Sequence, residues 1–377
     1  MSQKPIQKGI EVELFGGKPN GEVIPLSTSL KEQLSFITQE PDQRNFEYIT
    51  QPTTSYEELQ KEIIEPRIQI RKVLKDMGNL TLIPGSTIPL SFSKEFYFSK
   101  PGDPYHEYIC NNYQTSIITS SLHISFGIDN NKDLFNLLCA LRLDTSLFLA
   151  LSASSCFHDG NITGYKSYRW HTFPKTPAFV PFFKTHDEFI LWTKKQLEIK
   201  SMFNVRHLWS SIRPNGPDRP NKLNRIEVRI CDFISNPVKI LGIVALIECL
   251  IHNYLSTNKW PKVLSKTSKE LEEVARSSDK QEELAAKDGL TAKLWDWRND
   301  SENTAKQIIS NLYTELSPTA KNLDIIKYFN QIQLILEEEN EATQFLNHYG
   351  KTKSIQATIQ YFIEKFAESD LSFSKIL

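Results

Sequence analysis

The 377-residue sequence has no excess of charge of either sign. It contains 44 Lys and Arg against 45 Asp and Glu, which gives a formal net charge of -1 at pH 7. Proteins that bind nucleic acid or anionic membranes through their general surface usually carry a clear excess of basic residues. The composition excludes such a surface and predicts neither a nucleic-acid partner nor a membrane partner.

Long hydrophobic runs and a leader segment are also lacking. Residues 1–15 turn directly into an alternating pattern and have no apolar core of a signal peptide. The most apolar later stretch, Leu241–Ile251, is about half the length needed to cross a bilayer and contains Glu248. This stretch predicts a buried core helix. We expect a mature chain that starts at residue 1, has no membrane span and stays in the cytoplasm.

Cysteine motifs are absent. The five cysteines form no CxxC pair and no short Cys/His spacing; they stand at positions 110, 139, 156, 231 and 249. This pattern argues against a zinc site and against a disulfide scaffold. We predict reduced, mostly buried thiols. Cys156 lies in a polar segment, so it is either exposed or a small apolar filler.

The glycine-rich loops that cradle phosphates are absent too. The chain has neither a GxxxxGK[ST] loop nor a GxGxxG after a strand. Gly16 and Gly17 predict a hairpin turn instead. Any bound nucleotide must therefore be held by metal ions and side chains.

Residues 8–232 mix short alternating runs, turn signals and helical stretches, which predicts an α+β region. One long helix is expected over Tyr56–Met77, where Pro66 marks either a kink or a join between two helices. Another helix is expected from Lys132 to about Leu151.

After Asn236-Pro237 the pattern becomes a long apolar helix followed by Lys/Glu-rich helical segments. Ser317-Pro318 predicts a helix break in this nearly all-α part. We predict a catalytic sheet region at 1–237 and a helical region at 238–377 that packs on it, together forming one continuous domain.

Four strand-like runs place ionisable side chains on one face and apolar side chains on the other, because alternate residues of a strand face opposite sides. The runs are Gly9–Leu14, Arg44–Thr50, Leu122–Ile128 and Arg225–Asp232. Their polar faces carry Glu11 and Glu13, then Glu47, then His123 with Ser125, then Glu227 with Arg229.

Ordinary antiparallel strands with one solvated face would also alternate in this way. Solvated faces, however, usually mix Lys, Thr and Ser, whereas these faces offer four Glu, one His and one Arg. Two carboxylates 4 Å apart repel by about 4 kcal/mol at an effective dielectric of 20, and divalent cations would remove that cost. Magnesium takes one or two carboxylates together with phosphate oxygens, so the pattern favours Mg²⁺ with a nucleoside triphosphate.

A polar loop, Leu151–His171, is rich in hydrogen-bonding groups and leads to Arg169. Loops of this kind often bind substrates. The alternative is a surface loop with incidental serines, with Arg169 in a surface salt bridge.

Taken in order, these segments resemble the glutamate-cysteine ligase family, in particular the bacterial GCS2 branch shared with the carboxylate-amine ligases, and most closely its cyanobacterial form. The resemblance runs from about Gly9 to Pro237 through GIEVE, EPDQRNFEYITQP, IPGSTIPL, SSLHISFGI, LALSASSCFHDGNITGYKSYRW, NVRHLWSSIRPNG and NRIEVRICDF. Each piece is short, but the ordered set is specific. Cys156 stands where relatives usually have proline, and the C-terminal third matches only around AAKDGLTAKLW.

The resemblance implies an antiparallel sheet folded into a funnel, as in glutamine synthetase and the guanidino kinases, with flanking helices and a helical C-terminal region. It implies ATP and Mg²⁺ on the concave face. The residues that match the family's metal ligands are Glu11, Glu13, Glu47 and Glu227. His123 matches the histidine of the metal and nucleotide site, Arg229 the arginine that meets the transferring phosphate, and Arg169 the arginine placed toward the substrate.

The implied reaction is the ATP-dependent ligation of the glutamate γ-carboxylate to cysteine through a γ-glutamyl phosphate. Its product, γ-glutamylcysteine, would be made in the first step of glutathione biosynthesis. Three alternatives stay open: a ligase that uses another amine, a non-catalytic nucleotide-binding relative, and a guanidino phosphotransferase.

Overall fold

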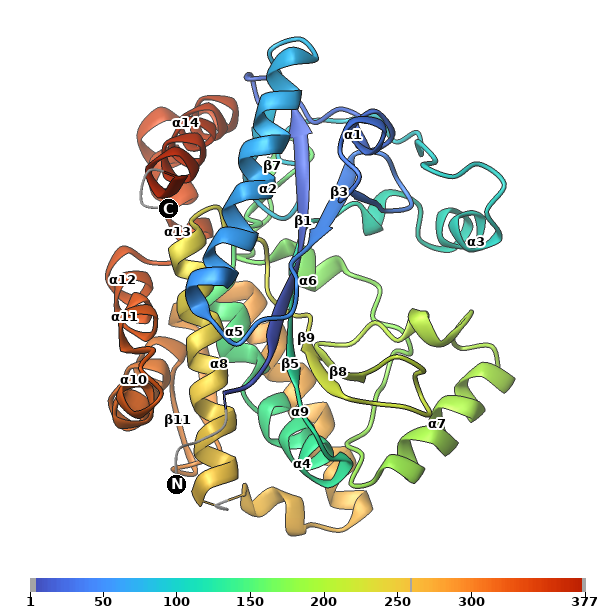
Figure 1. Cartoon of the computed structure of the whole chain (residues 1–377), viewed down its shortest axis with the longest axis vertical. Coiled ribbons are helices and arrows are strands. Elements are labelled where there is room, and N and C mark those ends of the chain that lie inside the picture. Colours follow the sequence, from blue (N-terminus) through green and yellow to red (C-terminus); the bar gives the residue numbers. More distant parts are fainter. Residues whose placement is uncertain (1–4, 258–259, 375–377) are drawn as a thin grey trace.

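A computed structural model describes residues 5–257 and 260–374 of the chain. Its centre is an antiparallel sheet in the order β2-β3-β1-β5-β9-β8, with β4 paired to the end of β1 (Figure 1). The strands are β1 Lys8–Gly17, β2 Thr38–Gln39, β3 Asn45–Ile49, β4 Thr81–Ile83, β5 Leu122–Gly127, β8 Ile212–Asn215 and β9 Arg225–Val228. The predicted α+β class is confirmed. The expected start of the chain, at residues 1–4, lies outside the described residues.

One face of the sheet is apolar and builds the core. Ile10, Val12 and Leu14 of β1 are at most 1% exposed and pack in one cluster with apolar residues of β5 and β9. Two long helices, α2 Tyr56–Asp76 and α8 Pro237–Thr257, lie along this side of the sheet (Figure 1). Because neighbouring residues of a strand alternate, Glu11 and Glu13 of β1 face away from this core.

The remaining helices flank the sheet or form an outer layer on α8. They are α1 Ser27–Gln33, α3 Pro104–Tyr113, α4 Asn131–Arg142, α5 Thr145–Ser152, α6 Tyr168–Thr172, α7 His186–Glu198, α9 Ser268–Asp288, α10 Ala305–Asn322, α11 Ile326–Phe329, α12 Gln331–Glu338, α13 Glu341–Thr352 and α14 Ile355–Ser374. Short 3-10 helices span Gln114–Ile117, Val205–His207, Lys262–Ser265 and Gly289–Thr291. Two small hairpins pair β6 Phe157–His158 with β7 Asn161–Ile162, and β10 Lys293–Asp296 with β11 Ser301–Thr304.

The helix α8 contains the predicted core segment Leu241–Ile251. By length and composition it is the one described helix apolar enough to cross a membrane, or one of two if the bent pair α4 and α5 counts as a span. Its apolar window is 83% buried inside the protein. Burial between the sheet and the outer helices accounts for its composition, and the prediction of a buried core helix is confirmed.

The cysteines are free, and all are buried except the partly buried Cys110.

Two prolines lie inside helices. The helix α2 runs continuously through Pro66, and α10 runs through Pro318, so the predicted break at Ser317-Pro318 is wrong. A proline inside a helix costs about 3 kcal/mol. Apolar residues on both sides of each proline are buried in the core. Each large apolar side chain stabilises the fold by about 1.5–3 kcal/mol on burial, which offsets the loss.

The helix predicted from Lys132 to Leu151 is two helices, α4 and α5, bent by 57°. The bend lies at Asp144, which is 1% exposed. The Asp144 carboxylate accepts hydrogen bonds from Trp297 Nε1 at 3.2 Å and Arg298 Nη2 at 2.5 Å. These distant partners fix the bend, and the local sequence pattern does not contain them.

Gly16 and Gly17 do not form the predicted turn. They end β1 and pair with residues of β4. The chain turns afterwards, at Lys18–Glu22, where Gly21 has a φ of 94°. A Cβ on Gly17 would lie 2.0 Å from the Glu22 backbone oxygen, so glycine is needed there for the close approach of the returning chain.

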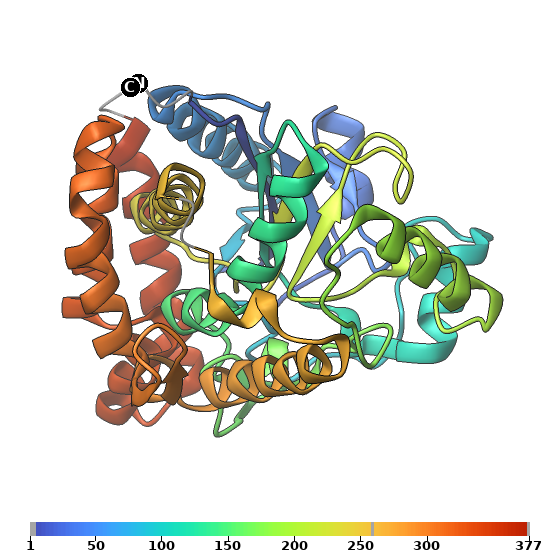
Figure 2. The same ribbon diagram turned by 90° about the horizontal axis from the view of Figure 1, so that it is seen from below.

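The helices α10–α14 form an outer layer on the side away from α7 (Figure 2), whereas α9 packs against α5 and α6. Buried polar contacts tie this layer to the sheet region. Arg67 of α2 lies 3.4 Å from Asp370 of α14, both with fully buried side chains, and Glu341 of α13 accepts a hydrogen bond from the Ser235 N–H at 2.8 Å. We propose that residues 1–237 and 238–377 form one continuous domain.

This proposal predicts the unfolding of Asp370→Ala. The substitution leaves Arg67 buried without its carboxylate, which is expected to lower the free energy of unfolding by about 3–5 kcal/mol. In one domain the whole protein should still unfold in a single calorimetric transition at a lower temperature. A second transition left at the wild-type temperature would contradict the proposal.

Candidate active site

A cavity of about 500 Å³ opens on the polar face of the sheet. Its floor consists of β1, β3 and β5, and its walls come from α3, α6 and the segment that precedes β8. Six of the seven residues predicted for the site line it: Glu11, Glu13, Glu47, His123, Arg169 and Arg229. The seventh, Glu227, is fully buried next to Arg229.

The strand register brings the acidic residues together. Glu13 is directly opposite Glu47 of β3, and Glu11 is directly opposite His123 of β5. Directly opposite residues of antiparallel strands have Cβ atoms about 4.5–5.5 Å apart. Segments separated by more than 100 residues therefore place their polar side chains in two neighbouring rows on one face of the sheet.

Two groups of three side chains have the spacing of metal ligands among the described residues. One group is Glu11, Glu47 and His123, and the other is Glu13, Glu40 and Glu47. Within each group the ligand atoms lie within 4.8 Å of one another, and Glu47 belongs to both. Five carboxylate and imidazole groups of this kind suit a hard divalent cation, whose remaining positions would be filled by phosphate oxygens or water.

Glu40 was not predicted from the sequence. It follows β2, and the turn behind it is held by a buried ion pair in which Arg44 Nε and Nη2 donate to the two oxygens of Asp42, each at 2.8 Å. Arg44 also donates to the backbone oxygens of Ser93 and Glu95, which fixes this turn to the next segment. The sequence contained one signal for Glu40: it is a carboxylate in the segment EPDQR, which precedes the strand that carries Glu47.

The carboxylates in this site cannot all ionise easily without a cation. Burial, and then the charge of Glu13, raise the pKa of Glu40 to about 8. Burial, together with the charges of Glu40 and Glu11, raises the pKa of Glu47 well above its ordinary value. Burial is the largest effect on Glu11 and raises its pKa, but the hydrogen bond with His123 at 2.9 Å and the charges of His123 and Arg229 together outweigh it, so the pKa of Glu11 is lowered.

These shifts predict how stability depends on pH in protein freed of divalent cations. A carboxyl whose pKa rises from 4.5 to about 8 on folding binds more protons in the folded state, so stability falls as the pH rises through that interval. Thermal melts in EDTA should show this fall, and melts with Mg²⁺ should show less of it. A fall of equal size with and without Mg²⁺ would contradict the predicted metal site.

Glu227 belongs to neither metal-ligand group of the described residues. Its carboxylate accepts two hydrogen bonds from Arg213, Nε to Oε2 and Nη2 to Oε1, each at 2.9 Å. Asn215 Nδ2 and Arg229 Nη1 donate to it at 2.6 Å each. Burial opposes ionisation of Glu227, but the charges of Arg213 and Arg229 hold its pKa well below the ordinary value.

The structure therefore brings Glu227 to Arg229 rather than to the other carboxylates. It orients the Arg229 guanidinium, whose Nη1 also lies 3.3 Å from His123 Nδ1. Arg213 and Asn215 were missed, because the run that holds them, IRPN, contains a proline and shows no clear alternation. An alanine at position 227 would leave Arg213 buried without a charge partner, so Glu227→Gln is the better test of its role.

The two ends of the segment Leu151–His171 are largely buried, whereas residues 158–166 in its middle are partly or fully exposed. Four of its serines are at most 2% exposed and do not line the cavity: Ser152, Ser154, Ser155 and Ser167. These four serines therefore lie behind the cavity rather than in it, and Arg169 is not in a surface salt bridge. Cys156 is also fully buried, which agrees with a small apolar filler. Arg169 alone extends from this segment into the cavity, and it is 2% exposed.

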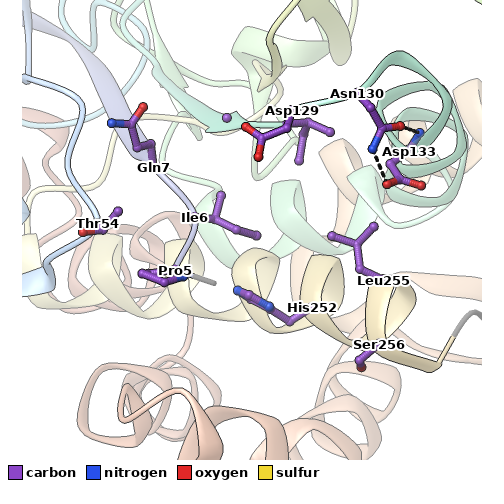
Figure 3. A pocket seen from close by; sticks show the side chains of 12 residues that line it. Pro5, Ile6, Gln7, Thr54, Asp129, Asn130, Asp133, His252, Leu255 and Ser256 are labelled. Atoms are coloured by element: carbon purple, nitrogen blue, oxygen red, sulfur yellow. Dashed lines mark hydrogen bonds between the residues drawn. The ribbon is translucent and has the colours of Figure 1, made fainter. Parts of the chain in front are cut away.

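A larger cavity of about 650 Å³ lies beside the C-terminal end of α8 (Figure 3). The N-terminal segment, the start of α4 and the end of α8 line it, with Gln7, Asp129 and His252 pointing inward. None of its lining residues is Arg or Lys, and neither metal-ligand group of the described chain includes them. The smaller cavity therefore holds the groups that could act on a nucleotide.

An antiparallel sheet that gathers carboxylates, an imidazole and arginines in one cavity fits the class of carboxylate-amine ligases. Within this class, the chain belongs to glutamate-cysteine ligase family 2 (GCS2), whose family model matches residues 7–360. The resemblance drawn from the sequence is confirmed, and the match extends it into the C-terminal third.

Curated relatives agree with this membership. A protein of Solibacter usitatus (strain Ellin6076), provisionally named glutamate–cysteine ligase 2, is 25% identical over 315 residues, covering 82% of this chain and 78% of its own. A protein of Chloroflexus aurantiacus (strain ATCC 29366 / DSM 635 / J-10-fl) has the same provisional name. It is 24% identical over 340 residues, covering 89% of this chain and 83% of its own.

Two solved structures share the fold. A bifunctional glutathione synthetase from Pasteurella multocida superposes with a TM-score of 0.74 at 14% identity, over 97% of this chain. This chain spans about half, 52%, of that longer protein. A glutamate–cysteine ligase from Francisella tularensis in complex with AMP superposes with a TM-score of 0.69 at 14% identity, over 99% of this chain and 90% of its own.

Proposed function

We propose that the protein joins the γ-carboxylate of glutamate to the amine of cysteine, with ATP and Mg²⁺, and releases γ-glutamylcysteine, ADP and phosphate. This would be the first step of glutathione biosynthesis, carried out in the cytoplasm. The observation that supports it most strongly is the pair of metal-ligand groups that share Glu47 in the same cavity as Arg229. The AMP bound in the Francisella tularensis structure supports a nucleotide ligand for this fold.

The side chains that would hold Mg²⁺ are Glu11, Glu13, Glu40, Glu47 and His123. They supply oxygen donors and one imidazole nitrogen at the required mutual spacing. Bound Mg²⁺ would neutralise charge on the phosphate oxygens and hold them in line with the attacking carboxylate. Glu227 would act through Arg229, because its own oxygens are occupied by hydrogen bonds from Arg213, Asn215 and Arg229.

The reaction would proceed in two displacements. An oxygen of the glutamate γ-carboxylate attacks the terminal phosphorus of ATP, and ADP leaves. The amine nitrogen of cysteine then attacks the acyl carbon, loses a proton, and inorganic phosphate leaves. In both steps negative charge accumulates on phosphate oxygens, so fixed positive groups lower the barrier more than proton transfer by a carboxylate would.

Arg229 would stabilise the transferring phosphoryl group. Glu227 fixes one end of its guanidinium, so little reorganisation is needed when the charge develops. Arg169 would face the amino-acid substrate, as the family resemblance implies. Both side chains line the cavity.

The test is phosphate release from ATP and Mg²⁺ with glutamate, with each common amino acid or small amine added in turn, and products identified by mass. Release that needs both glutamate and cysteine, with γ-glutamylcysteine formed, is the expected result. Release with a different amine would replace the substrate and keep the mechanism. A phosphorylated product would indicate a phosphotransferase, and no release with any amine would indicate a non-catalytic relative.

A further inference from the structure

Asp232 is a buried carboxylate close to the cavity that the reaction above does not use. It lies three residues after Arg229, is fully buried and does not line the cavity. Its Oδ2 accepts hydrogen bonds from the Ser154 N–H at 2.9 Å and the Ser155 hydroxyl at 2.7 Å. Its Oδ1 accepts one from the Ser167 hydroxyl at 2.8 Å and lies 3.5 Å from Arg169 Nη1.

The same segment holds the Arg169 guanidinium. Arg169 Nη1 donates to the Ile230 oxygen and Nη2 to the Arg229 oxygen, each at 3.1 Å. The Arg169 backbone N–H donates to the Ser155 hydroxyl at 3.1 Å, and the Asp232 N–H donates to the Ser152 hydroxyl at 3.1 Å. Two of the arginines that line the cavity, Arg169 and Arg229, are therefore joined through one stretch of backbone, residues 229–232.

We propose that Asp232 is a positioning residue that fixes Arg169 and Arg229 relative to each other without touching either substrate. The proposal rests on the proposed function, because that function assigns both arginines to contacts with the reacting groups. It also explains the serine-rich segment. The serine hydroxyls and the Ser154 N–H surround Asp232 with donors, so the segment serves the geometry of Arg169 from behind the cavity.

The site requires a carboxylate in particular. Every group that faces Asp232 is a donor, and two donors face each oxygen. In Asp232→Asn one oxygen becomes an NH₂ group. If the NH₂ group occupies the position of Oδ2, it faces the Ser154 N–H, a second donor that cannot rotate away. If the NH₂ group occupies the position of Oδ1, it faces Arg169 Nη1, while the Ser167 hydroxyl can rotate to accept a hydrogen bond from it. The second orientation costs less, and it displaces Arg169 directly.

A buried Arg–Asp pair could instead serve stability alone, and the chain offers a matched control for that possibility. Asp370 is also fully buried and lies 3.4 Å from Arg67 and 2.8 Å from Arg71, outside the cavity. Asp370→Asn therefore makes the same chemical change in a comparable setting. If Asp232 only stabilises the fold, the two variants should behave alike.

The experiment compares full-length Asp232→Asn and Asp370→Asn in melting temperature and in steady-state kinetics for glutamate, cysteine and ATP. We expect Asp232→Asn to lower kcat/KM for glutamate by about 100-fold, since a displacement of about 1 Å in a positioned group can cost that much. Asp370→Asn should lower the melting temperature and leave the kinetic constants within about twofold. Wild-type kinetics in Asp232→Asn, or an equal loss in both variants, would overturn the proposal.

Two further measurements keep the outcome clear. If Asp232→Asn does not fold, Ser155→Ala removes one donor to Asp232 and should shift the glutamate kinetics in the same direction by a smaller factor. If the wild-type protein turns over no substrate, the proposed function fails, and a crystal structure of the Asp232→Asn or Ser155→Ala variant tests the positioning role by itself. Arg169 should have left the Ile230 and Arg229 oxygens, and an unmoved Arg169 would overturn the role.

Discussion

Arg229→Lys is expected to reduce kcat by about three orders of magnitude while the protein stays folded, because arginines that stabilise a transferring phosphoryl group contribute about 10³–10⁵. Lysine keeps the positive charge but offers a single ammonium group. It cannot bind Glu227 with one nitrogen and present others to the phosphate in a fixed plane. The measurement is phosphate release at saturating ATP, glutamate and amine.

The matched control for this prediction is Arg225→Lys. Arg225 begins the same strand, β9, but its Nη1 donates to Asn224 and it does not line the active-site cavity. This variant should keep kcat within about twofold, since surface substitutions away from buried contacts have small effects. If Arg229→Lys retained more than about a tenth of the wild-type kcat, Arg229 would not be the group that meets the transferring phosphate.

The polar face of the sheet could be predicted from the sequence because alternation within a strand is a local property. The spacing of Glu11 and Glu13 requires that both point away from Ile10 and Val12, whatever the strand pairs with. The partners across the sheet are not local. That Glu13 faces Glu47, and that Glu11 faces His123, follows from strand order and register. The family resemblance anticipated only that these side chains share one site.

The residues missed at the site lie where local rules lose force. Glu40 follows the two-residue strand β2, so no alternation marks it, and its position depends on the distant contacts of Arg44 with Ser93 and Glu95. The serine-rich segment was misjudged for a related reason. Polar composition normally indicates exposure. Here a single buried carboxylate, Asp232, accepts hydrogen bonds from the Ser155 and Ser167 hydroxyls, which offsets the free-energy cost of burying them.

Glu47→Gln is expected to remove activity and, at the same time, to stabilise the metal-free protein. Glu47 is the one side chain common to both metal-ligand groups of the described residues, so its loss weakens both. A metal ion contributes several kcal/mol of charge stabilisation in a transition state, so kcat/KM should fall by about 100-fold or more. Raising the Mg²⁺ concentration should recover only part of this loss.

The gain in stability follows from the direction of the pKa shift. Burial and the neighbouring charges of Glu40 and Glu11 raise the pKa of Glu47 well above 4.5 in the folded protein. When the pH rises above the pKa that Glu47 has in the unfolded chain, its ionisation therefore favours unfolding. Glutamine has nearly the same shape without the charge. In EDTA at pH 8 the variant should melt at a higher temperature than the wild type, and added Mg²⁺ should raise its melting temperature less.

Glu65→Gln serves as the control, because Glu65 is exposed on α2, on the opposite side of the sheet from the cavity. It should change neither the activity nor the effect of Mg²⁺ on the melting temperature. A cation site holds carboxylates that repel one another close together, and this repulsion destabilises the metal-free fold. Removal of one such carboxylate should therefore move stability and activity in opposite directions. A Glu47→Gln variant that lost both stability and activity would show that Glu47 supports the fold rather than a metal ion.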